Sequence, residues 1–138
     1  MTTFGAVMRS DNLTVKAQEA LAGARDVAIS RHHAEIAPEH LLVSLIEQDG
    51  GLVPRVLGRL GADARVVIAD VNRALEKLPK VQGAALDVGI SRALKELWEV
   101  AAKEAGKFKD EFLSTEHFLL VLAEARGAAG DALRNAGA

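Results

Sequence analysis

The sequence predicts an all-α domain made of two related helical units, and three observations lead to this prediction. Apolar residues recur every three or four positions along most of the chain, which is the period of an amphipathic helix. Capping residues precede these segments, and glycine or proline follows them. The same order of caps and apolar positions occurs twice, with a spacing of 77 residues from His40 to His117. Apolar runs do not alternate with polar residues, so strands receive little weight.

The first unit, residues 13–77, is predicted to begin with two helices. Thr14 is a good N-cap, and a stripe of small apolar residues follows it up to Ala28. A loop comes next, in which His32-His33 is expected to lie in solvent. The second helix is predicted to begin at Pro38, because proline is tolerated in the first turn, and to end before Gly50-Gly51.

Two further helices are predicted to complete the first unit. A short one runs from Arg55 to Leu60, with Pro54 before it and Gly61 as its C-terminal cap. A longer one runs from Ala64 to Lys77 after the N-cap Asp63. A connector, residues 78–89, then contains proline and glycine and shows no sustained period.

The second unit, residues 90–138, is predicted to contain three helices. Ser91 caps the first, Ser114 opens the second, and the third runs from Ala128 to Ala136. Together the two units form one domain, residues 10–138, preceded by a lead-in of residues 1–9.

The duplication is supported by caps, core positions and loop lengths that agree at one offset, which predicts pseudo-twofold packing. The given sequence shows no counterpart of the helix from Ala64 to Lys77 in the second unit; either the sequence stops early or the second unit lacks its fourth helix. Apolar surface in the second unit is therefore expected to be less covered than in the first. The chain is expected either to be less stable than a version extended by one amphipathic helix or to pair with another copy through this edge. The residues compared are Phe118, Leu122 and Leu133 against Leu41, Leu45 and Leu57.

Composition excludes several classes of protein. The 138 residues suffice for one domain that folds without metal or disulfide, and cysteine is absent. The net charge of −2 disfavours a nucleic-acid-binding surface. No apolar run approaches the ~20 residues of a membrane span, and no signal peptide is apparent, so the chain is expected to be cytoplasmic. A phosphate-binding G-x-x-x-x-G-K-[ST] loop is also absent, which predicts no ATP hydrolysis by this chain.

Each unit resembles the Clp repeat, which occurs as a pair at the N-terminus of Clp-type AAA+ unfoldases and disaggregases. The resemblance runs from Met8 to Ala138 and is carried by order and spacing. Its motifs are Leu13-Thr14-x-Lys16-Ala17-x-x-Ala20-Leu21, Ile36-Ala37-Pro38-Glu39-His40-Leu41-Leu42 and Leu113-Ser114-Thr115-Glu116-His117-Phe118-Leu119-Leu120. The connector Leu78-Pro79-Lys80-Val81-Gln82-Gly83 is most similar to the ClpB branch.

The resemblance implies a non-catalytic outer module that captures exposed apolar segments of unfolded or aggregated polypeptides for a hexameric AAA+ ring. It also implies substrate-binding roles for Thr14, Asp110 and Glu116. From the residues alone, Thr14 is an N-cap, Asp110 a loop acid and Glu116 a first-turn acid, and both interpretations remain open.

The resemblance further implies an apolar groove along the first helix of the second unit and the loop and helix after it. The positions expected to face this groove include Trp98, Val100, Phe112 and Leu113. Glu104 and His117 stand where apolar groove residues are usual in the family, which predicts a weaker groove.

Three alternatives to this interpretation remain open. The resemblance also allows an adaptor-docking domain of a protease-linked unfoldase, or a free-standing Clp-repeat protein. The third is a metalloenzyme using His33, His40 and His117. Adjacent residues on a helix point about 100° apart, so neither Glu39-His40 nor Glu116-His117 suits chelation by neighbours. We therefore expect structural roles for these histidines, and no catalytic residue, metal or cofactor.

Overall fold

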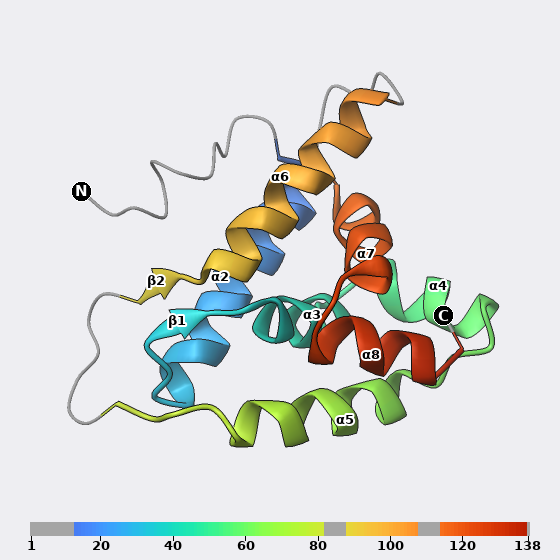
Figure 1. Cartoon of the computed structure of the whole chain (residues 1–138). Coiled ribbons are helices and arrows are strands. Elements are labelled where there is room, and N and C mark those ends of the chain that lie inside the picture. Colours follow the sequence, from blue (N-terminus) through green and yellow to red (C-terminus); the bar gives the residue numbers. More distant parts are fainter. Residues whose placement is uncertain (1–12, 82–87, 108–113, 138) are drawn as a thin grey trace.

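Seven helices and two short strands make up the described residues, 13–81, 88–107 and 114–137, of the computed structural model (Figure 1). This confirms the predicted helical fold. The first unit contains α2 (Val15–Ser30), α3 (Pro38–Glu47), α4 (Val53–Arg59) and α5 (Ala64–Glu76). The second unit contains α6 (Arg92–Lys107), α7 (Thr115–Glu124) and α8 (Ala128–Asn135). None of these helices is long and apolar enough to span a membrane.

Side-chain caps fix three of the helix starts where the sequence predicted them. The Thr14 hydroxyl accepts from the Ala17 amide at 3.1 Å, and the Asp63 carboxylate accepts from the Arg65 amide at 2.9 Å. Ser91 Oγ accepts from the Leu94 amide at 3.0 Å. These bonds satisfy amides that have no partner inside the helix.

The two strands were not predicted. β1 (Glu35–Ile36) and β2 (Gly89–Ile90) pair in parallel, with Glu35 opposite Gly89 and Ile36 opposite Ile90. The Ser91 amide also donates to the Ile36 carbonyl at 3.0 Å. Two residues are too short to show the alternation by which strands are recognised in a sequence, which explains the omission. The pairing ties the start of the second unit to the first.

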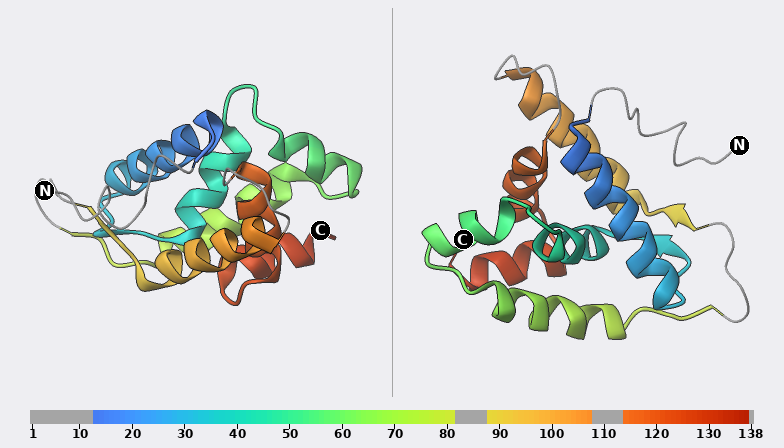
Figure 2. Two further views of the ribbon diagram at one scale, coloured as in Figure 1. Left: turned by 90° about the horizontal axis from the view of Figure 1, so that it is seen from above. Right: turned by 180° about the vertical axis from the view of Figure 1, so that it is seen from behind.

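The central helices α3 and α7 contact each other, and α2 and α6 lie on opposite sides of them when the molecule is seen from above (Figure 2, left). Each outer helix packs against the central helix of its own unit. This arrangement buries the apolar stripes of all four helices in one core.

Helix α5 packs against α8 of the second unit as well as against α3, and it runs directly below α8 in Figure 1. The side chains of Phe118, Leu122 and Leu133 are fully buried. The expectation that they would be poorly covered is therefore wrong, because helices of the first unit cover the second: α5 contacts α8, and α2, α3 and α4 contact α7. The prediction that one more helix would stabilise the chain depended on exposed apolar surface around these residues, and that surface is buried.

Candidate functional site

A groove of about 360 Å³ lies between the first half of α6 and the end of α7, with the start of α3 at one side. Most of its lining is apolar. The apolar residues are Pro38, Ala93, Leu97, Val100, Val121 and Ala125, and the charged ones are Glu96, Glu124 and Arg126. Leu97 and Val121 are buried, whereas Val100 is 48% exposed. A groove lined by an exposed valine together with buried apolar side chains is suited to contact with another chain.

An aromatic contact joins the two helices that line most of the groove. Trp98 of α6 meets Phe118 of α7 edge to face, with ring centroids 5.4 Å apart and planes at 73°. This geometry is favourable for aromatic rings, and Phe118 is fully buried. The contact fixes α6 against α7 and thereby holds the two groove walls.

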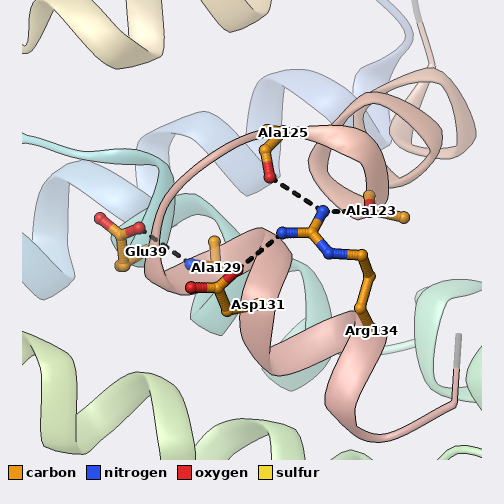
Figure 3. Close-up of polar contacts among 6 residues, drawn as sticks. All are labelled: Glu39, Ala123, Ala125, Ala129, Asp131 and Arg134. Carbon is orange, nitrogen blue, oxygen red and sulfur yellow. Dashed lines mark hydrogen bonds and ion pairs between the residues drawn. The ribbon is translucent and has the colours of Figure 1, made fainter.

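The first turn of α8 is capped from the other unit (Figure 3). The N-cap residue of α8 is Gly127, which has no side chain and adopts a φ of 114°. Glu39 of α3 supplies the acceptor instead, and its Oε2 lies 3.0 Å from the Ala129 amide. A carboxylate there also interacts favourably with the helix dipole. Because Glu39 follows Pro38, this contact holds α8 beside the groove.

The end of α7 is held by a second contact in the same region. The Arg134 guanidinium donates to the carbonyls of Ala123 at 2.9 Å and Ala125 at 3.0 Å, and its other nitrogen pairs with Asp131 at 2.7 Å (Figure 3). Carbonyls at a helix C-terminus have no partner within the helix, so the arginine satisfies them. Ala125 lines the groove, and its backbone is therefore fixed by Arg134.

Replacement of Glu39 by alanine is expected to lower the free energy of unfolding by about 1 kcal/mol, the usual effect of losing a helix cap. Hydrogen exchange should become faster at the Ala129 amide. Glu39→Gln retains an acceptor and should recover most of the loss. Glu47→Ala, an exposed site at the end of the same helix, serves as the control. Unchanged exchange at Ala129 in Glu39→Ala would contradict the assignment.

Among the described residues predicted to bind substrate, one lines the groove and the others do not. Val100 lines this groove, and its role in binding substrate stays a prediction. Thr14 is half-buried as the N-cap of α2, and Glu116 is exposed in the first turn of α7, so neither lines this groove. Asp110, Phe112 and Leu113 lie outside the described residues.

The other residues considered for the groove are mostly inside the fold. Trp98 is half-buried against Phe118. His117 is buried, and its Nδ1 accepts from the Ser114 amide at 2.9 Å. Glu104 is half-buried. The structural role expected for His117 at the third helical position is thus confirmed.

The expectation that His32-His33 lies in solvent is correct for His32 and wrong for His33. His32 is exposed, but His33 is buried and its Nδ1 lies 2.8 Å from Nε2 of His40. Nδ1 of His40 accepts from the Ala37 amide at 2.8 Å, which requires the neutral His40 to carry its proton on Nε2. His40 therefore donates to His33. A positive φ of 61° at His32 turns the chain so that His33 points inward.

Both rings of this pair favour the neutral form. Burial lowers the pKa of His40 from 6.5 to about 4, with contributions from His33 and Arg31. Burial also lowers the pKa of His33, as do Arg31, Lys80 and His32, while the backbone of Leu75 opposes the change. Among the described residues, no three histidines or acids are grouped as a metal site would require. The His33–His40 pair is therefore a contact within the core.

Sequence reasoning missed most of the groove residues, including Val121, Ala125 and Pro38. A usable signal was present in the repeat. At the 77-residue offset, Val121 and Ala125 replace Ser44 and Gln48, so polar positions of the first unit become apolar in the second. Pro38 gave no such signal, because the first unit contributes it through the tertiary fold.

This geometry defines a class of protein: a helical domain of two related units with an apolar groove at the second unit. The family described as Clp repeat (R) N-terminal domain matches residues 12–136. The chain belongs to this family, and the resemblance stated from the sequence is confirmed.

Curated relatives support the same assignment. The chain is 35% identical over 123 residues to the chaperone protein ClpB of Bacillus cereus, covering 87% of this chain and 14% of the relative. It is 36% identical over 130 residues to ClpB of Vibrio cholerae, covering 94% and 15%. The chain thus spans about one seventh of these relatives.

Solved structures share the fold. The Hsp104 N-terminal domain from Candida albicans has a TM-score of 0.79 at 22% identity, with 91% of this chain and 82% of that chain covered. A ClpV N-domain solved in complex with a VipB peptide has a TM-score of 0.73 at 20% identity, with 93% and 80% covered.

Proposed function

We propose that this domain captures exposed apolar segments of unfolded or aggregated polypeptides for a ClpB-like disaggregase, and that it is not itself catalytic. The observation that carries the proposal is the groove between α6 and α7, whose lining combines exposed Val100 with buried Leu97 and Val121. An extended segment with apolar side chains would remove Val100 from water on binding. The ClpB relatives, which are named chaperones, support the same role.

Affinity is expected to be weak. The groove is small and open, and a disordered segment loses conformational entropy when it is fixed there. We expect a dissociation constant of ~1 μM or weaker, equivalent to about −8 kcal/mol or less favourable. Such weak binding suits a module that must release its bound polypeptide. For the whole protein we propose that the recipient is the pore of a hexameric AAA+ ring and that the protein acts in the cytoplasm.

The proposal is tested by titration with reduced, carboxymethylated lactalbumin, which stays unfolded, and with folded lactalbumin as the control. Only the unfolded chain should bind, and the backbone amide shifts should change at Leu97, Val100 and Val121. Changes near Asp110 and Phe112 are expected as well. Changes confined to His32 and His33, or equal binding of the folded protein, would contradict the proposal.

Docking of an adaptor protein is the second candidate function. Its support is the ClpV N-domain, which was solved with a VipB peptide. A pull-down that offers an unfolded protein and a folded adaptor in parallel separates the two functions. Retention of the adaptor alone would favour docking.

A further inference from the structure

The hairpin of α2 and α3 is closed at the position that corresponds, 77 residues earlier, to the groove between α6 and α7. Ser44 Oγ of α3 donates to the Ala20 carbonyl of α2 at 2.6 Å. A Cβ atom added to Gly23 would lie 2.4 Å from the same oxygen, well inside van der Waals contact. The two helices therefore approach more closely here than a side chain at residue 23 would permit.

Two more hydrogen bonds close this first hairpin farther along. Lys16 Nζ donates to the Asp49 carbonyl at 2.7 Å, and Gln48 Nε2 donates to the Lys16 carbonyl at 2.7 Å. We call the three contacts Ser44–Ala20, Lys16–Asp49 and Gln48–Lys16 the latch. All three join a side chain to a backbone carbonyl across the hairpin, so the latch holds the start of α2 against the end of α3.

The second hairpin lacks the donors of the latch. Lys16, Ser44 and Gln48 each have a counterpart 77 residues later, and each counterpart lines the groove. These counterparts are Ala93, Val121 and Ala125. None has a side-chain donor, so α6 and α7 cannot form the same three bonds.

The counterpart of Gly23 completes the contrast. It is Val100, whose branched side chain lies at the groove and is 48% exposed. The close approach at Gly23 and Ser44 is therefore replaced by two valines, Val100 and Val121. Two β-branched side chains between helices keep the backbones farther apart than glycine and serine do.

We infer that Val100 and Val121 determine which unit binds, because they open the second hairpin, while the latch keeps the equivalent site of the first hairpin shut. The inference rests on the proposed capture of apolar segments. The domain should therefore bind one apolar segment at a time, although its two units share a fold.

The first experiment measures the stoichiometry of the unmodified chain with a short fluorescent peptide rich in leucine and valine. We expect one peptide per domain, with shift changes at Val100 and Val121. Two peptides per domain, or changes at Gly23 and Ser44, would overturn the inference. No binding of peptide or unfolded lactalbumin by the parent chain would instead contradict the proposed function.

The second experiment gives the second hairpin the residues of the first. The double variant Val100→Gly/Val121→Ser should bind the peptide at least tenfold more weakly. The matched control is Val66→Gly in α5, a helical valine of the same 48% exposure that lines no part of the groove. The control should bind as the parent does. Equal affinity of parent and Val100→Gly/Val121→Ser would contradict the inference alone.

A reciprocal variant separates closure from the simple loss of apolar atoms. Lys16→Ala/Gln48→Ala removes two bonds of the latch and copies Ala93 and Ala125 of the second hairpin. Hydrogen exchange at the Ser44 and Gly23 amides should increase by at least tenfold, and a second, weaker peptide should bind. Unchanged exchange together with a stoichiometry of one would show that the latch does not close the site.

Discussion

Acidification from neutral pH to about pH 4 is expected to lower the free energy of unfolding by about 3 kcal/mol through His40. Its pKa is lowered from 6.5 to about 4 in the folded chain because the ring is buried beside His33 and Arg31. The unfolded chain therefore binds more protons between these two values. The stability is unaffected above about pH 6.5, falls progressively below it and levels off near pH 4, and His33 acts in the same direction.

Urea unfolding at a series of pH values measures this loss. His40→Gln is the informative variant, since glutamine at the third helical position can also accept from the N-cap amide but does not titrate in this range. Its stability should vary less between pH 6.5 and 4 than that of the parent. His117→Gln leaves the His33–His40 pair in place and is the matched control. A parent stability that is constant over this range would contradict the prediction.

Replacement of Phe118 by alanine is expected to lower the free energy of unfolding by about 3–5 kcal/mol. The ring is fully buried, and its loss removes both its packing and the edge-to-face contact with Trp98. For a domain of this size the melting temperature should fall by roughly 10–15 °C. Trp98 is the one tryptophan of the chain, so its fluorescence reports directly on the contact.

Leu120→Ala on the same helix is the matched control, because this leucine is 54% exposed. Its effect should stay within about 0.5 kcal/mol. If both variants melted at the same temperature, Phe118 would not have the anchoring role assigned to it.

The helices could be predicted from the sequence because their signals are local. Thr14, Asp63 and Ser91 each cap a helix through an amide two or three residues away, and such a contact leaves a mark in a short stretch of sequence. The β1–β2 pairing joins residues far apart in the chain and left no comparable mark. The burial of His33 likewise depends on His40 and on the turn at His32.

The groove was predictable only in part, for the same reason. Val100 followed from the family resemblance, and it lies in the groove. Pro38 comes from the other unit, and the contact between Glu39 and Ala129 spans 90 residues of sequence. The covering of α8 by α5 is also a contact between units, which is why the expected exposure of Leu133 was wrong.

The position of α5 has a consequence for how the two units depend on each other. Its buried residues Val67, Val71 and Leu75 belong to a helix that contacts both α3 and α8, so a single unit on its own would leave apolar area uncovered. Such a unit would need a second copy from solution, and its folding would depend on protein concentration. Joining the units in one polypeptide makes their association intramolecular, with an effective concentration in the millimolar range for a short connection. The domain is thus a tethered dimer that cannot dissociate on dilution.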